Sequence, residues 1–252
     1  MILTCAAMKA IEERAFADGV SADALMEEAG LQIARAVRQF FPRPGVCLAV
    51  FGKGNNGGDA LVAARHLARW DWDVRLVAAY PDAEWGALPK LKFAAAKQCR
   101  RAEPGQIGSI KGSPLVVLDG LLGIGARGEL REPLSGITQA INQLRRRSNA
   151  VVFALDIPTG LDGDTGEADP ACIVADHTLA VGFAKRGLIA DAAANFTGRL
   201  SVLPLGELTR RIGDAPADDV VATPQVLAPL LPRRDFDTHK GDCGRVGLVA
   251  GS

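Results

Sequence analysis

The chain has 252 residues, of which 48% are hydrophobic and 23% charged, as in ordinary soluble globular proteins. Lys and Arg together number 29, as do Asp and Glu, and this balance argues against a broad basic surface for nucleic acid or anionic membrane. No apolar stretch is long enough to span a membrane, and the N-terminus lacks the pattern of a signal peptide. The five cysteines are dispersed without a C-x-x-C pair, which predicts reduced thiols in a cytoplasmic protein.

The N-terminal part predicts two helices, over residues 8–17 and 22–41. Ser21 is the expected N-cap of the second, whose apolar residues fall on one face. Gly30 lies inside this second helix, where glycine is less favourable than alanine by about 1 kcal/mol. We therefore expect a close packing contact at Gly30.

The next stretch predicts a strand, a turn and a helix. Residues 46–51 are uninterruptedly apolar, as in a strand buried on both faces. Residues 52–59 form a glycine-rich polar turn, and residues 60–70 have helical periodicity. Such a unit directs free N–H groups and the positive helix end at one point. The turn either caps the helix after a tight bend or forms a polar pocket floor for a ribose, a phosphate or a cation.

Five further strands are predicted over 73–80, 113–119, 150–155, 176–182 and 200–203, with helices over 88–98 and 133–147. Alternating strands and helices indicate an α/β fold, a Rossmann-like three-layer sandwich with a mostly parallel central sheet. The loops at 52–59, 119–128 and 156–162 follow strand ends and are polar or glycine-rich. Ligands bind at the carboxyl ends of such strands, so we expect one crevice where these loops converge.

The regular alternation stops after residue 205. Residues 206–237 contain scattered prolines and indicate a linker. Residues 245–250 predict one more buried strand. Because so short a tail cannot form its own core, we interpret it as a linker followed by the first strand of another domain.

Two carboxylates, Asp119 and Asp156, each follow an apolar strand. A carboxylate there is partly desolvated unless it meets a cation or hydrogen-bond donors; helix capping is the alternative role for each. Asn56, Asp119 and Thr159 together supply only oxygen donors. Such a set suits a hard monovalent or divalent cation and not zinc.

Three motifs carry a family resemblance: Gly54 to Asp59, Asp119 to Gly128, and Asp156-Ile-Pro-Thr-Gly-Leu-Asp162. Their order and spacing resemble the NAD(P)H-hydrate epimerase domain, as does Leu25-Met26-Glu27 before Ala29-Gly30. The tail from His239 resembles the start of the ADP- or ATP-dependent NAD(P)H-hydrate dehydratase domain. The resemblance implies an epimerase domain over 1–205, a linker over 206–237 and the truncated start of a dehydratase, a lyase, over 238–252.

The resemblance also implies an isomerase that interconverts the R and S forms of hydrated NADH and NADPH. It implies a K+ ion held by Asn56, Asp119 and Thr159. The implied substrate contacts are Asn55, Asn56, Gly57, Gly58, Asp59, Gly123, Ile124, Gly125, Ala126, Arg127, Gly128, Glu129 and Asp156. The chain departs from the family pattern at Ala60, which replaces a glycine, at Thr159, which replaces a serine, and at Ile124 and Ala126.

Asp156 is the candidate catalytic residue. The hydrate carries a hydroxyl on a ring carbon next to nitrogen, so inversion requires loss of water to a delocalised cation and readdition on the other face. One carboxylate can protonate the leaving hydroxyl and later accept a proton from the incoming water. Lys185 either meets a phosphate or carboxamide of the substrate or is a solvated surface lysine.

Two alternatives are weighed against the epimerase. The G-x-G-x-x-G spacing and Asp82, at the end of a strand, favour an NAD-dependent dehydrogenase. Asp59 in the turn opposes it, because a carboxylate there repels a pyrophosphate. The other alternative is a non-catalytic nucleotide-binding scaffold, which loss of Asp156 would mark. We expect a small-molecule substrate, a homo-oligomer, no nucleic-acid or membrane partner, and a fused dehydratase domain in the full-length protein.

Overall fold

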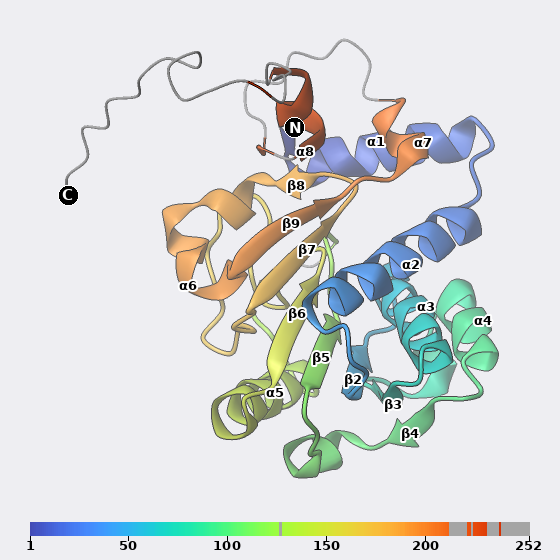
Figure 1. Cartoon of the computed structure of the whole chain (residues 1–252), viewed down its shortest axis with the longest axis vertical. Coiled ribbons are helices and arrows are strands. Elements are labelled where there is room, and N and C mark those ends of the chain that lie inside the picture. The colour runs from blue at the N-terminus through green and yellow to red at the C-terminus, as the bar shows by residue number, and fades with distance from the viewer. Residues whose placement is uncertain (126–127, 212–220, 223, 231–236, 238–252) are drawn as a thin grey trace. The chain divides into compact units, whose positions relative to one another are not determined.

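The computed structural model describes residues 1–125, 128–211, 221–222, 224–230 and 237 (Figure 1). The chain divides into two units, Met1–Val220 and Val221–Ser252. The second contains the short helices α8 (Pro224–Leu227) and η5 (Ala228–Leu230). The strand predicted over 245–250 and the dehydratase start predicted over 238–252 lie outside the described residues. None of the described helices has the length and apolarity needed to cross a membrane.

A seven-stranded parallel sheet forms the centre of the first unit, in the order β4-β3-β2-β5-β6-β7-β9. The chain runs outward from β2 to β4, then returns to the other side of β2 and continues to β9. The switch point of the topology therefore lies between β2 and β5. The strands are β2 (Val46–Phe51), β3 (Asp73–Ala78), β4 (Arg100–Ala102), β5 (Leu115–Gly120), β6 (Val151–Leu155), β7 (His177–Val181) and β9 (Arg199–Leu203).

Helices cover both faces of this sheet and confirm the expected α/β class. Successive residues of β2 point to opposite sides, with Cys47, Ala49 and Phe51 in one core and Leu48 and Val50 in the other. The first core also contains residues of α1 (Cys5–Ala17), α2 (Ala22–Phe40) and α3 (Asn55–Arg69), with α4 (Ala87–Ala95) packed on α3. The second contains α5 (Leu134–Ser148) and η2 (Pro104–Ser109).

Helix α3 begins at Asn55, five residues before its predicted start at residue 60. The predicted turn over 52–59 therefore ends at Gly54, the N-cap, and Asn55 to Asp59 form the first turns of the helix. The glycines in these turns are needed because neighbouring atoms leave no room for a side chain. A Cβ at Gly57 would lie 2.3 Å from the Gly52 carbonyl oxygen, and one at Gly58 would lie 2.4 Å from the Met26 sulfur. Packing thus overrides the low helix propensity of glycine.

The close contact expected at Gly30 is confirmed, because a Cβ there would lie 2.4 Å from Cβ of Val62 on α3. Ser21 caps α2 as predicted, its side chain accepting from the Ala24 amide. The short edge strand β4 escaped prediction, since its three residues are mainly charged and have no apolar run.

A second, two-stranded parallel sheet pairs β1 (Ile2–Leu3) with β8 (Ala184–Lys185), neither of which the sequence predicted. This pairing positions the N-terminus beside Lys185, and α1 starts directly after β1. The remaining short elements are η1 (Asp82–Glu84), η3 (Arg186–Ile189), η4 (Asp191–Ala193), α6 (Ala194–Thr197) and α7 (Gly206–Thr209). Helix α7 contacts α1 and buries Leu208 in the first core, so the segment predicted as a linker starts as part of this unit. The division at residues 205 and 237 stays a prediction.

Candidate functional site

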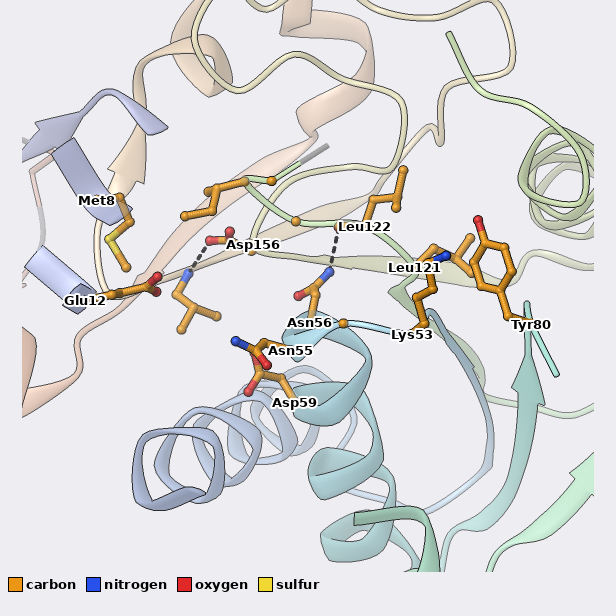
Figure 2. A pocket seen from close by; sticks show the side chains of 15 residues that line it. Met8, Glu12, Lys53, Asn55, Asn56, Asp59, Tyr80, Leu121, Leu122 and Asp156 are labelled. Carbon is orange, nitrogen blue, oxygen red and sulfur yellow. Dashed lines mark hydrogen bonds between the residues drawn. The ribbon is translucent and has the colours of Figure 1, made fainter. Parts of the chain in front are cut away.

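The three predicted loops converge on one cavity of about 360 Å³ at the switch point between β2 and β5 (Figure 2). This is where ligands bind in open parallel sheets, and the volume falls within the range of small-molecule pockets. We call it the switch-point pocket. Its lining residues from the three loops are Lys53, Gly54, Asn55, Asn56, Asp59, Leu121, Leu122, Gly123, Ile124, Gly125 and Asp156.

A second, larger pocket adjoins it. Its volume is about 790 Å³, and it shares Tyr80, Leu122 and Gly125 with the switch-point pocket. Gly128 and Glu129, predicted as substrate contacts, line this second pocket. The two cavities are therefore neighbours, with Tyr80, Leu122 and Gly125 lining both.

Asn56 is fixed at the start of α3 by two hydrogen bonds. Its side-chain nitrogen donates to the carbonyl oxygens of Leu122 (2.7 Å) and Leu155 (3.0 Å), and Figure 2 shows the first of these. These bonds determine which way the amide points. Its oxygen, Oδ1, is buried and has no hydrogen-bond partner among the described residues. An unpaired buried acceptor is costly, so this atom is suited to a cation or a donor from a ligand.

Asp119, at the end of β5, is fully buried and joined to Thr159. Its Oδ1 accepts from the Thr159 hydroxyl (2.7 Å) and its Oδ2 from the Thr159 amide (2.9 Å), while the Leu121 amide donates to Oδ1 at 3.3 Å. Burial raises the pKa of Asp119 to about 6, although these hydrogen bonds oppose the rise. No cationic side chain pairs with Asp119 among the described residues. Asp119 therefore makes the local hydrogen bonds expected of a capping residue, and it also has a buried negative charge that a cation could compensate.

The three predicted cation ligands come together around Leu122. Its carbonyl oxygen accepts from Asn56 and its amide donates to the Thr159 hydroxyl at 3.2 Å. The loop after β5 therefore ties α3 to the loop after β6. The occupant of this arrangement, K+ in the sequence analysis, stays a prediction.

Asp156 follows β6 and has a left-handed backbone, with φ of 68°. This conformation is unfavourable for a residue other than glycine, and such strain is concentrated at functional sites. Its Oδ1 accepts from the Val181 amide at 3.3 Å and forms an ion pair with Lys185. Its Oδ2 lies near Gly123, where a Cβ would be 3.7 Å away, and makes no hydrogen bond among the described residues. One carboxylate oxygen is thus anchored and the other is available.

Lys185 is fully buried, which rules out the solvated surface lysine of the sequence analysis. Its ammonium group donates to Asp156 and, at 2.9 Å, to the Val181 carbonyl oxygen. A buried lysine is tolerated only when it is paired, and Asp156 is that partner. Lys185 therefore anchors the candidate catalytic carboxylate.

Two further carboxyl groups line the switch-point pocket, from Asp59 on α3 and Glu12 on α1. Burial, and after it the charge of Asp156, raises the pKa of Glu12 to about 7, with Lys185 lowering it. Burial raises the pKa of Asp59 well above its usual value, and Asp156 and Glu12 raise it further. The pocket thus gathers three carboxyl groups around one buried lysine.

The predicted substrate contacts divide into groups. Asn55, Asn56, Asp59, Gly123, Ile124, Gly125 and Asp156 line the switch-point pocket. Gly57 and Gly58 do not line it; they are buried spacers that let α3 approach Gly52 and Met26. Ala126 and Arg127 lie outside the described residues. Ala60, which replaces a glycine of the family pattern, is accommodated because it packs against Gly120, which has no side chain.

Sequence reasoning did not assign Met8, Glu12, Tyr80 or Val181 to the site, although all four line it. Glu12 lies on a helix whose buried face is Met8, Ile11 and Ala15, and a charged residue beside such a face carries no signal of function. The pairing of β1 with β8 and the packing of Met8, Ile11 and Ala15 in the first core hold α1 at the pocket.

Comparison with known proteins gives a consistent result. The family described as "YjeF-related protein N-terminus" matches residues 22–187. The NAD(P)H-hydrate epimerase of Rhodopirellula baltica is 38% identical over 193 residues, which cover 72% of this chain and 74% of that protein. The NAD(P)H-hydrate epimerase of Cenarchaeum symbiosum is 35% identical over 205 residues, covering 78% and 91%.

Longer relatives match as well. The bifunctional NAD(P)H-hydrate repair enzyme of Pyrobaculum aerophilum is 36% identical over 249 residues, covering 93% of this chain and 46% of that protein. The chain spans about half the length of such bifunctional relatives. A crystal structure of the yeast protein ynu0 has the same fold, with a TM-score of 0.68 and 19% identity, covering 88% of this chain and 97% of that one.

Proposed function

The chain belongs to the YjeF-related N-terminal family, and we propose that it is an NAD(P)H-hydrate epimerase that interconverts the R and S hydrates of NADH and NADPH. The observation that carries this proposal is Asp156, a carboxylate with one anchored and one available oxygen in a pocket at the switch point of the sheet. The names of the relatives indicate the substrate, and the pocket supplies the chemistry.

Epimerisation inverts one ring carbon of the nicotinamide hydrate. The hydroxyl leaves as water after it is protonated, and the ring nitrogen delocalises the positive charge that remains. The carboxylate of Asp156 would lie next to this cation and stabilise it electrostatically. Its Oδ2, which has no hydrogen-bond partner among the described residues, is the oxygen that can exchange a proton with the water. Lys185 and Val181 hold the other oxygen and fix the orientation of the carboxylate.

The dimensions of the site support a dinucleotide. The hydrated nicotinamide would occupy the switch-point pocket, and the rest of the molecule would extend past Leu122 and Gly125, which line both pockets, into the adjoining one. Gly128 and Glu129, which the family resemblance implies as substrate contacts, line the second pocket and would meet this part of the molecule.

The oxygen donors also fit a monovalent cation. The fit rests on the unpaired Oδ1 of Asn56 and on the buried charge of Asp119. One carboxylate with neutral oxygens suits K+ better than Mg²⁺, which recruits more charge and retains waters. When bound, the ion would supply a positive charge beside Asp119 and hold the loops after β5 and β6 together.

A dehydrogenase is less well supported. Its ribose-binding acid would be Asp82, but Asp82 lies in η1, lines neither pocket and forms an exposed ion pair with Arg101 at 3.1 Å. A non-catalytic scaffold would not need the strained backbone and buried ion pair of Asp156.

The test is incubation with purified R-hydrate and measurement of the S form by chromatography. Wild-type protein should convert it faster than a sample without protein. Asp156→Asn should lose at least about 10²-fold of the rate, because an acid–base group is removed. Because this change leaves Lys185 buried without its partner, the variant should be less stable than the wild type, and its rate is measured at a temperature where circular dichroism shows it folded. Asp82→Asn is the matched control and should keep the wild-type rate. A wild-type protein that leaves the R-hydrate unchanged, or an Asp156→Asn variant with full activity, would contradict the proposal.

A further inference from the structure

Glu12 has no role in the function proposed so far, although it lines the same pocket as Asp156. We propose that Glu12 is a second proton-transfer group, which exchanges a proton with the substrate hydroxyl or water while Asp156 serves the other face of the ring. This inference rests on the proposed epimerase function and adds a residue from the N-terminal helix to it.

The geometry places Glu12 in the pocket by two constraints. Leu3 of β1 pairs with Lys185 of β8, which starts α1 next to the Asp156 ion pair. Met8, one helical turn before Glu12 on α1, also lines the pocket, so this face of the helix is turned toward it. Figure 2 shows the Glu12 side chain reaching the pocket from α1, while Asp156 enters from the end of β6.

The surroundings of Glu12 suit a group that gains and loses a proton. The charged groups that face it are Asp156, Lys185 and Asp59, together with Glu13 on its own helix. The Lys185 ammonium group donates its hydrogen bonds to Asp156 and Val181 and makes none to Glu12. Glu12 itself has no hydrogen-bond or ion-pair partner among the described residues. Burial and the charge of Asp156 raise its pKa to about 7, so both of its protonation states are accessible near neutral pH.

The chemistry favours two positions for proton transfer, one on each face of the ring. Water must leave one face of a flat ring and return to the other, and a single anchored carboxylate reaches one face more readily than both. In one direction, protonated Glu12 gives its proton to the hydroxyl, and the C–O bond breaks with its electron pair going to oxygen. Water then adds to the opposite face of the ring cation through an oxygen electron pair, and Asp156 takes the released proton.

The protons balance over this sequence. One proton moves from Glu12 to Asp156 in each conversion, and the reverse conversion returns it. Exchange with solvent in the open pocket resets the pair between turnovers in the same direction. No oxidant, reductant or further reactant is needed, since water is both released and consumed.

The test compares Glu12→Gln with Glu13→Gln, an exposed neighbour whose only ion pair among the described residues is with Lys9 at 3.8 Å. Rates of R-to-S conversion are measured against substrate concentration between pH 5 and pH 9. Glu12→Gln should lower kcat at least about 10-fold with KM changed less than about twofold, as for loss of a general acid. The limb of the kcat/KM profile near pH 7 should disappear. Glu13→Gln should match the wild type.

Glu12→Asp separates proton transfer from packing. It keeps a carboxyl group, so it should retain an ionisation limb in the pH profile even if its rate falls. Residual activity with the wild-type pH profile in Glu12→Gln would overturn the inference, as would an unchanged kcat. Either result leaves the epimerase assignment intact as long as the wild type converts the R-hydrate. An inactive wild type would instead overturn the proposed function.

Discussion

At the scale of single residues, the pairing of Asp156 with Lys185 has the largest consequence. The Lys185 side chain is fully buried and that of Asp156 is 12% exposed. The two charges compensate each other in a region where neither is well solvated. Removing one of them leaves the other buried and unpaired, and this costs far more than the pair contributes while intact.

Lys185→Met should therefore lower the free energy of unfolding by about 3 kcal/mol or more. The double variant Asp156→Asn with Lys185→Met should recover part of this loss, because no unpaired charge remains. Lys53→Met is the control, since Lys53 forms an exposed pair with Glu84 and its loss should change stability by about 1 kcal/mol or less. Urea unfolding of the four proteins measures these differences. Equal stability of Lys185→Met and wild type would show that the ion pair is not energetically important.

At the scale of elements, the ends of β5 and β6 and the start of α3 meet around Leu122. The connections are hydrogen bonds from Asn56, Thr159 and the backbone. Buried oxygen atoms from three different elements lie here, and Asp119 is the one ionisable residue among the three predicted cation ligands. A bound cation would hold these elements together and so stabilise the fold by mass action.

We predict that K+ raises the melting temperature of the wild type by a few degrees, relative to a bulky organic cation at the same ionic strength. Asp119→Asn should lose most of this gain, because the carboxylate charge that attracts the ion is absent. Asp82→Asn, which removes an exposed carboxylate that lines neither pocket, should keep the stabilisation by K+. Identical melting temperatures of the wild type in the two salts would remove the cation from this site.

At the scale of the whole molecule, the site makes stability depend on pH. Burial raises the pKa of Glu12 to about 7 and of Asp119 to about 6, and raises that of Asp59 well above 3.8. These groups hold protons in the folded state at pH values where the unfolded chain has released them. Folding stability therefore falls as pH rises from about 4 to about 7. Burial lowers the pKa of His66 and His177, which opposes this trend weakly because both are partly exposed.

The melting temperature, measured without K+ and without substrate, should consequently drop by a few degrees between pH 5 and pH 8. Glu27 and Glu207, whose pKa values are lowered by their Lys and Arg partners, lose their contribution below pH 4.5 and do not affect this range. Glu12→Gln should reduce the drop in melting temperature, because the glutamine side chain does not ionise and so adds no buried charge as the pH rises. A melting temperature that rises over this range would contradict the prediction.

The sequence by itself determined the class of fold and the position of the site along the chain. Apolar runs such as 46–51 and 150–155 are local signals of buried strands, and their alternation with helices implies a parallel sheet. The glycine and carboxylate motifs follow strand ends, so the convergence of Asn56, Asp119 and Asp156 follows from the order of strands and motifs along the chain. The comparisons confirm the family.

Only the tertiary structure decided which groups complete the site. Glu12 and Lys185 are separated by 173 positions from each other in the sequence, and neither has a local pattern that indicates function. Lys185 pairs with Asp156 and Glu12 lines the same pocket, while β1 and β8, two strands of two residues each that periodicity cannot detect, hold the start of α1 beside Lys185. Likewise, Gly57 and Gly58 lie inside α3 because Gly52 and Met26 leave no room for a Cβ at these positions. Such contacts depend on how distant segments pack, and that information is absent from a local window of sequence.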